Sequence, residues 1–224
     1  MNIGIKATAA SLVGFILFGL ALFLPAGTFN YWQAWLFIAV FAATGAIPTI
    51  YWAQRRPEVL RRRMNAGPAA ETRVAQKIIV TGIQLWFFAV LVVSALDHRF
   101  GWLQVSIPVV LIGDVLVAVG LGIALLVVQQ NNYASANITV ETDQQLVTTG
   151  LYGLVRHPMY LGSLIMVAGI PLALGSYWGL LGIIPGLVVL AYRIVDEEKM
   201  LRQELNGYVE YTQKVHSRLV PYVW

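Results

Sequence analysis

The side chains best suited to chemistry lie in two groups in the C-terminal half of the sequence. The first falls in Leu151–Gly162, where an apolar stretch begins, and the second follows the next apolar stretch. Their charged and aromatic members are Tyr152, Arg156, His157, Tyr160, Arg193, Glu197, Glu198, Tyr208 and Tyr211. Because polar groups at a membrane boundary are costly to order and are usually functional, the two groups predict a cytosol-facing pocket for a lipophilic substrate.

The composition indicates a membrane protein. Of the 224 residues, 58% are hydrophobic and only 12% are charged, whereas a soluble domain carries about 25% charged residues. The net charge of +4 comes from basic residues in loops and tails, so we expect no nucleic-acid partner. The absence of cysteine excludes disulfides, thiolate nucleophiles and cysteine-based metal sites, and the three scattered histidines do not suggest a metal site.

Six apolar segments predict an all-α, polytopic integral membrane protein with five or six transmembrane helices. The segments are Ala7–Leu24, Tyr31–Ala53, Ile78–Leu96, Val105–Val128, Met159–Leu174 and Tyr177–Tyr192. We expect a single membrane domain over residues 1–224, with N-terminal transmembrane helices in residues 1–128. The first segment could be mistaken for a signal peptide, because Lys6 precedes it and Pro25-Ala26-Gly27 follows it. Five further apolar segments favour a membrane anchor that is retained.

Basic residues in the short loops predict the orientation, because cytosolic loops carry an excess of Lys and Arg. The loop Gln54–Lys77 and the C-terminal tail hold most of them, while the turns near Pro25, Arg99 and Gly175 hold only Arg99. With six spans, both termini, the Arg-rich loop and the pocket fall on the cytosolic side of a multi-pass membrane protein.

The last two segments are short and predict a helical hairpin over Pro158–Tyr192. Each has about 16 residues, where roughly 20 are needed to span the hydrocarbon untilted. Pro171 and Pro185 are expected to kink these helices, and Gly175 marks the turn between them. The charged segment Arg193–Val215 is expected to form a separate cytosolic amphipathic helix that rests on the pocket or the membrane surface.

Pro158 is well suited to be the first residue of a helix, where its missing N–H is not needed. The free N–H groups of that first turn form a site for an anion such as a carboxylate or a phosphate. Arg156 and His157 flank this position. The alternative is that these two side chains only mark the membrane interface.

Glu197 and Glu198 directly follow the last apolar segment. Their carboxylates could accept hydrogen bonds from ribose hydroxyls or pair with Arg156, and Arg193 is placed to pair with Glu197 one helical turn away. The plainer alternative is a solvated helix start, where acids favour the helix dipole.

Asp114 stands alone inside the fourth apolar segment. It could bond to Gln84 or to another buried polar group, and the sequence leaves open whether its role is structural or functional.

These residues resemble the isoprenylcysteine carboxyl methyltransferase family and are similar to the wider group that includes membrane phospholipid methyltransferases. The resemblance covers residues 145–222. It is carried by Leu146–Tyr152, Arg156-His157-Pro158, Tyr160, Gly162, Arg193, Glu197-Glu198, Tyr208, Tyr211 and Pro221. The chain departs from the family pattern at Leu205–Tyr208 and at His216 and Arg218.

The resemblance implies a membrane methyltransferase that uses S-adenosylmethionine, with the cofactor in a cytosolic pocket closed by the C-terminal helix. A lipophilic or prenylated substrate would enter sideways from the bilayer and its lipids. The residues implied to line the cofactor pocket are Tyr152, Arg156, His157, Pro158, Tyr160, Glu197, Glu198 and Tyr208. The implied catalytic residues are Arg193, which would orient the acceptor, and Arg156.

The sequence leaves open which group accepts the methyl group and which reaction class the protein belongs to. Methyl transfer to a carboxylate needs alignment of donor and acceptor and exclusion of water, whereas a phenol or an amine would also need a base such as Glu198 or His157. The first rival function is an NADPH-dependent membrane reductase of the sterol reductase type, which has a similar arginine–histidine hairpin. The second is a small transporter or scaffold without enzymatic activity.

Overall fold

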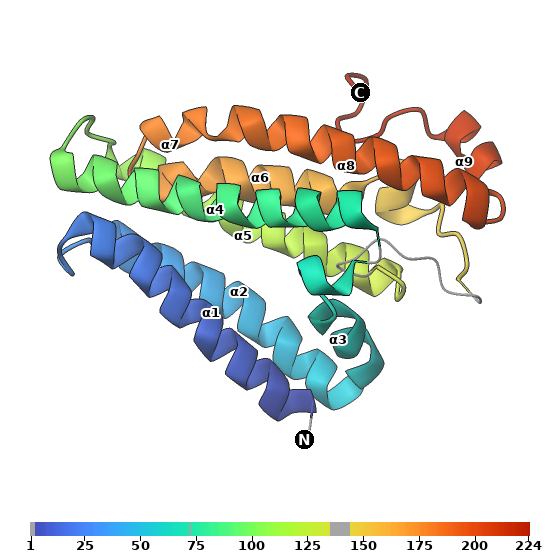
Figure 1. Cartoon of the computed structure of the whole chain (residues 1–224), viewed down its shortest axis with the longest axis horizontal. Coiled ribbons are helices and arrows are strands. Elements are labelled where there is room, and N and C mark those ends of the chain that lie inside the picture. Colours follow the sequence, from blue (N-terminus) through green and yellow to red (C-terminus); the bar gives the residue numbers. More distant parts are fainter. Residues whose placement is uncertain (1–2, 72, 135–143) are drawn as a thin grey trace.

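The computed structural model describes residues 3–71, 73–134 and 144–224, and within these ranges the chain is helical with no strand. The helices are α1 (Ile3–Ala26), α2 (Trp32–Arg55), α3 (Pro57–Met64), η1 (Pro68–Ala70), α4 (Val74–Phe100), α5 (Ile107–Gln130), η2 (Gly150–Gly153), α6 (Pro158–Ala173), α7 (Trp178–Leu181), α8 (Ile183–Glu204) and α9 (Tyr208–Lys214). They form an elongated bundle, with α3 and α9 at the same end (Figure 1). We call this end the site end.

The structure confirms an integral, multi-pass, all-α architecture. Five helical units are long and apolar enough to cross a membrane, namely α1, α2, α4, α5 and the pair α7–α8. The fifth predicted segment, Met159–Leu174, corresponds to α6, which has only 16 residues and is shorter than these units. Large apolar side chains such as Leu12, Ile47 and Leu85 are exposed on the outside of the bundle, as a lipid-facing surface requires.

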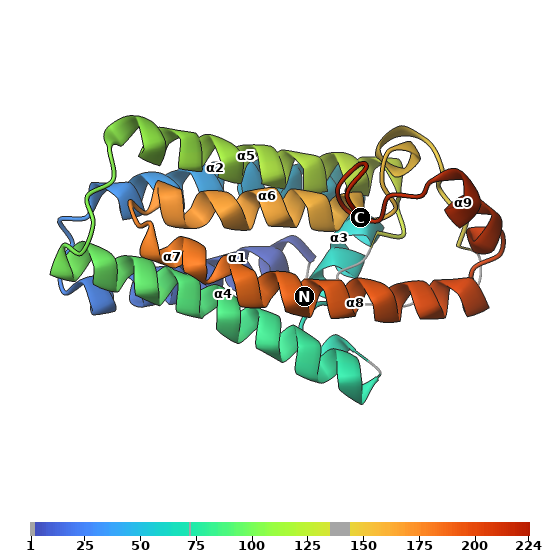
Figure 2. The same cartoon turned by 90° about the horizontal axis from the view of Figure 1, so that it is seen from above.

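The helices α5 and α6 lie side by side in both views (Figures 1 and 2) and pack backbone to backbone. Glycines make this approach possible. A Cβ atom on Gly120 would lie 2.4 Å from the carbonyl oxygen of Gly162, and one on Gly169 would lie 2.6 Å from the carbonyl oxygen of Gly113. The contact fixes the position of α6. Arg156 and His157 directly precede the first turn of this helix and are positioned with it.

The helices α1 and α2 diverge from α4 and α5 toward the site end, where α3 lies (Figure 1). At the narrower part, aromatic rings fill the space between α1, α2 and α4. Phe18 contacts Phe37 and Phe41 of α2 as well as Phe87 and Phe88 of α4, with ring centroids 5.0–6.3 Å apart. The N-terminal pair of helices is therefore joined to the rest through this aromatic cluster.

The predicted hairpin over Pro158–Tyr192 is present, but the expected separate helix over Arg193–Val215 is wrong in its boundary. The helix α8 runs without a break through Arg193 to Glu204, and only Tyr208–Lys214 forms a distinct helix. No proline or glycine interrupts the chain between Gly186 and Gly207, so nothing stops the helix where its surface becomes polar. Pro185 lies in the first turn of α8, where a missing N–H removes no helical hydrogen bond.

Candidate functional site

A cavity of about 570 Å³ opens between α4, α5, α6, α8 and α9. Its polar side chains gather toward the site end, and the remainder of its wall is apolar. The polar lining residues include Arg63, Asn131, Tyr152, Arg156, His157, Tyr160, Arg193, Glu197, Tyr208 and Tyr211. The apolar ones include Phe41, Val80, Phe87, Phe88, Leu121, Leu164, Val167, Ile183, Leu187 and Leu190. One continuous space thus offers both polar partners and a hydrocarbon wall.

The start of α6 places His157 and Pro158 against the cavity. Pro158 is the first residue of the helix, as predicted, and no side chain caps this N-terminus. The preceding turn η2 begins at Gly150, whose φ of +62° is in the left-handed region that favours glycine. The N–H of Leu151 donates to Oε1 of Gln130 at 3.0 Å, which ties η2 to the end of α5.

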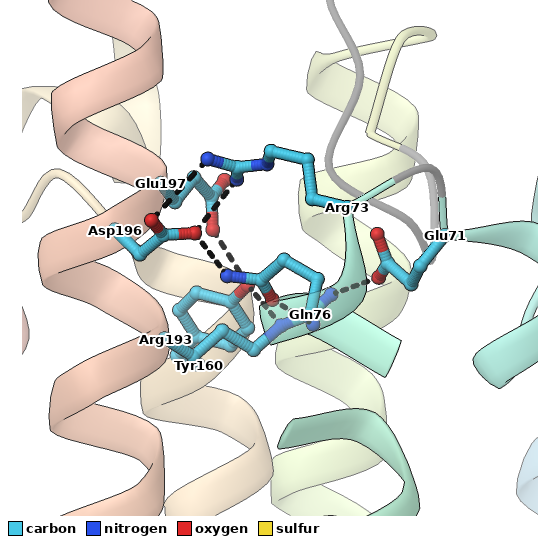
Figure 3. A network of polar contacts seen from close by, with 7 residues as sticks. All are labelled: Glu71, Arg73, Gln76, Tyr160, Arg193, Asp196 and Glu197. Atoms are coloured by element: carbon cyan, nitrogen blue, oxygen red, sulfur yellow. Dashed lines mark hydrogen bonds and ion pairs between the residues drawn. The ribbon is translucent and has the colours of Figure 1, made fainter. Parts of the chain in front are cut away.

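Arg193 is held by several protein groups at once (Figure 3). Its Nε donates to the hydroxyl of Tyr160 at 2.9 Å, Nη1 donates to Oε1 of Gln76 at 2.8 Å, and Nη2 lies 3.1 Å from Oε1 of Glu71. Arg193, Gln76 and Glu71 are all buried. The guanidinium therefore clamps α8 to α6, to the start of α4 and to the segment before it.

The same network continues to the two acids next to Arg193. The hydroxyl of Tyr160 donates to Oε2 of Glu197 at 2.6 Å, so Arg193 and Glu197 share one phenol. Arg73 pairs with Asp196 at 2.7 Å, and Gln76 also donates to Asp196. Glu197 lines the cavity, and its Oε1 accepts no hydrogen bond from a described residue. That oxygen is available to a ligand.

Glu198 lies behind the cavity wall and is only 3% exposed. Its Oε1 is 2.8 Å from Nε of Arg156 and 3.3 Å from Nε2 of His157, and its Oε2 is 3.1 Å from Nε of Arg218. A buried carboxylate needs such opposite charges. Of the two roles open to the acids in the sequence, Glu198 takes the pairing with Arg156. It holds Arg156 and His157 in place, and a direct role toward a cofactor stays a prediction.

The C-terminal strap, Val215–Trp224, covers Arg156 and His157. The N–H of Arg156 donates to the carbonyl of Ser217 at 3.0 Å, and the N–H of His157 donates to the carbonyl of Arg218 at 2.9 Å. Leu219 is buried, and the guanidinium of Arg218 lies over the ring of Trp224 at 5.3 Å. The strap closes this side of the site.

Three tyrosines form the wall on the α9 side. The hydroxyl of Tyr211 donates to the carbonyl of Tyr152 at 2.6 Å, and Nδ2 of Asn131 donates to the hydroxyl of Tyr152 at 3.1 Å. Burial raises the pKa of Tyr152, Tyr208 and Tyr211 above the usual range, so all three are neutral phenols.

The hydroxyl of Tyr208 is buried and has no hydrogen-bond partner among the described residues. A buried hydroxyl without a partner is unfavourable by about 1–3 kcal/mol, and such groups call for an explanation. Because Tyr208 lines the cavity, a polar group of a bound ligand would supply the missing partner.

Sequence reasoning missed several residues of the site. Glu71, Gln76 and Asn131 had no motif to mark them, and Arg63 was interpreted only as part of a topology signal. The sequence left open a bond from Asp114 to Gln84 or to another buried polar group, and neither is observed among the described residues, since both carboxylate oxygens of Asp114 are buried without a described partner. Over the described ranges, no group of three or more His, Asp or Glu side chains is arranged to hold a metal ion.

Comparison with known proteins identifies related chains. Residues 108–206 match the family described as Phospholipid methyltransferase. A stretch of 94 residues, 39% of this chain, is 35% identical to the Delta(14)-sterol reductase TM7SF2 of Mus musculus. That stretch is 22% of the reductase, so the chain spans only about a fifth of this relative's length.

The fold is similar along nearly the whole chain to a solved membrane enzyme structure, that of the eukaryotic intramembrane Ras methyltransferase ICMT (isoprenylcysteine carboxyl methyltransferase) without a monobody. The TM-score is 0.50 at 15% sequence identity, over 97% of this chain and 86% of that chain. At this identity the likeness concerns the fold. The resemblance predicted from the sequence is thus confirmed: residues 108–206 match the phospholipid methyltransferase family, and the chain has an ICMT-like membrane fold.

Proposed function

We propose that this protein is an integral membrane methyltransferase that uses S-adenosylmethionine to methylate a lipophilic acceptor, most favourably an acceptor carboxylate. The observation that carries the proposal is the single cavity with a polar end and an apolar end. A water-soluble cofactor and a hydrocarbon chain have opposite solvation needs, and this cavity meets both. The match of residues 108–206 to a methyltransferase family supports this reaction class.

The polar end fits the parts of the cofactor. The free Oε1 of Glu197 suits ribose hydroxyls or an amino group, and the unpartnered hydroxyl of Tyr208 offers one more hydrogen bond. The uncapped N-terminus of α6 suits a carboxylate. The faces of Tyr152 and Tyr208 suit a sulfonium cation. Bound S-adenosylmethionine would supply an electrophilic methyl group at this end.

The reaction asks the protein for alignment rather than for a strong base. An ionised acceptor carboxylate would attack the methyl group that the bound cofactor supplies, forming a C–O bond as the C–S bond breaks with its electron pair going to sulfur. No proton is transferred. The network around Arg193 and the strap-covered pair Arg156–His157 hold the walls of the cavity rigid, which keeps the two reactants in line.

We also propose that the site end faces the cytosol and that both termini lie there. The basic side chains of α3, namely Arg61, Arg62 and Arg63, are at this end, as is the end of α8. Cytosolic loops are the ones enriched in Lys and Arg.

Calorimetry on the purified chain in detergent tests the cofactor. We expect saturable binding of S-adenosylhomocysteine and none of NADPH. The reductase remains the second candidate because a sterol reductase relative is 35% identical over 94 residues of this chain. Binding of NADPH alone would favour the reductase. Binding of neither ligand would favour the alternative of a transporter or scaffold without enzymatic activity.

Two substitutions test the residues of the polar end. Glu197→Gln and His157→Ala should weaken binding of S-adenosylhomocysteine about tenfold or more, because each removes a charged or polar partner worth roughly 1.5–3 kcal/mol. Lys199→Gln, an exposed change on the same helix, is the matched control. Unchanged affinity in both site variants would remove these residues from the cofactor pocket.

A further inference from the structure

Arg63 on α3 is a cation of the cavity wall that has no acidic partner among the residues that the structure describes. Its Nη1 lies 4.0 Å from the sulfur of Met159. Within the ranges that the structure describes, no carboxylate lies at ion-pair distance from it. Arg73, Arg156 and Arg193, by contrast, each lie within 3.1 Å of a carboxylate oxygen.

The position of Arg63 makes the missing counter-ion costly. Arg63 lines the main cavity and also a second cavity of about 300 Å³ between α1, α2, α3 and α5. Leu121 and Ala124 are the other residues common to both cavities. Partial burial among these apolar groups lowers the pKa of the guanidinium, although an arginine still keeps its proton at neutral pH. A desolvated cation in this position favours an anionic ligand.

The surroundings strengthen the attraction for an anion. Met159, which Arg63 contacts, is the second residue of α6, and no side chain caps that helix N-terminus. The N-terminal end of a helix carries partial positive charge. Arg193, the residue expected from the sequence to orient the acceptor, is already engaged by Tyr160, Gln76 and Glu71. Arg63 has no comparable set of partners among the described residues.

We propose that Arg63 binds the anionic head group of the lipophilic acceptor, while the hydrocarbon chain of that acceptor occupies the apolar part of the main cavity. This inference rests on the proposed function, because it names the substrate-binding residue of the same site. It selects an amphiphile that carries one negative charge next to a long apolar chain. The planar guanidinium fork suits a carboxylate, which it can hold through two parallel bonds.

The test compares a long-chain acid with its neutral counterpart. Oleic acid and methyl oleate are titrated against the full chain in neutral detergent, with wild type, Arg63→Gln and Arg63→Lys. Arg61→Gln is the matched control, because Arg61 is exposed on the same short helix. Wild type and the control should bind the acid about tenfold or more tightly than the ester. Arg63→Gln should bind both alike, and Arg63→Lys should keep part of the preference.

Oleyl phosphate, which has the same chain, shows which anionic head group is preferred. Tighter binding of the phosphate than of the carboxylate would replace the carboxylate in the proposal while keeping Arg63. Acetate should not bind at these concentrations, because it lacks the chain. A head-group preference that persists in Arg63→Gln, or that is absent from wild type, overturns the inference.

Affinity for S-adenosylhomocysteine, measured on the same samples, separates this inference from the proposed function. We expect it to stay within about threefold in every Arg63 variant, which also shows that the variants are folded. If wild type does not bind S-adenosylhomocysteine, the proposed function fails while the oleate comparison still reports on Arg63. If Arg63→Gln does not fold, Arg63→Met keeps the apolar stem of the side chain and removes the charge.

Discussion

Replacing Arg193 by lysine tests whether this residue mainly holds the site together. The guanidinium has partners on three sides, the hydroxyl of Tyr160, Oε1 of Gln76 and Oε1 of Glu71. A lysine ammonium is a point donor that cannot reproduce this fork, and we expect it to keep about one of these bonds. Two charged hydrogen bonds at the lower value of about 1.5 kcal/mol each give a loss of roughly 3 kcal/mol.

A loss of this size should be visible as a fall in melting temperature. For a chain of about this length, 1 kcal/mol corresponds to roughly 2–4 °C, so Arg193→Lys should melt about 6–12 °C lower than wild type. Arg202→Lys, exposed near the end of α8, is the matched control and should melt as wild type does. Fluorescence-monitored melting in one detergent compares all three proteins.

The same variant separates a structural role from acceptor alignment. If Arg193 only orients the acceptor, Arg193→Lys should lose turnover while its melting temperature stays within about 2 °C of Arg202→Lys. That result would refute the clamp deduced from the three bonds. If the clamp is correct, cofactor affinity should fall as well, since Tyr160 connects Arg193 to Glu197.

Three further changes test other parts of the structure. Gly120→Ala should destabilise the α5–α6 contact by about 1–3 kcal/mol, because its Cβ would lie 2.4 Å from a backbone oxygen, whereas Gly122→Ala faces open space and should be neutral in a melting assay. Tyr208→Phe should weaken S-adenosylhomocysteine binding about two- to tenfold without lowering the melting temperature of the free protein, and unchanged calorimetric affinity would show that the hydroxyl has no ligand. Reporter fusions at Trp224 and near Arg99 should report opposite sides of the membrane, and signals from the same side would contradict the proposed topology.

The sequence predicted the helices well where apolar length decides the structure. Long apolar runs predict the ends of α1, α2, α4 and α5 within a few residues. In a membrane, a single segment can satisfy its own backbone hydrogen bonds only as a helix. The apolar segment that begins at Tyr177 gave the wrong helix end, because the change to polar residues at Arg193 was interpreted as the end of the helix. Backbone hydrogen bonding does not stop where the environment changes, so α8 continues to Glu204.

The hydrogen-bond partners within the site could not be predicted from the spacing of neighbouring residues. Arg193 bonds to Gln76 and Glu71, which are 117 and 122 residues away in sequence. Spacing instead suggested a direct pair with Glu197, and the structure places Tyr160 between them. A distant partner is chosen by how helices pack, which a single sequence does not specify.

One packing signal was present in the sequence and was not used. Gly113 and Gly120 on α5 have the same spacing as Gly162 and Gly169 on α6, and the two pairs face each other in the structure. Small residues at a helical repeat are typical of close helix contacts in membranes. This pattern alone would have predicted the α5–α6 pair.

The charge balance of the cavity discriminates among possible acceptors. Arg193 and Arg156 lie beside Glu71 and Glu198, so these two cations are already compensated by the protein. Arg63 lines the same cavity, and no carboxylate of a described residue compensates its charge. A protonated amine would add a second positive charge near Arg63 and near the sulfonium of the proposed cofactor, and a neutral phenol would leave Arg63 without a counter-ion. An acid alone removes that cost, and it requires no base to become nucleophilic. Because no described carboxylate compensates Arg63, its charge supports the proposal of a lipophilic acid, rather than an amine or a phenol, as the methyl acceptor.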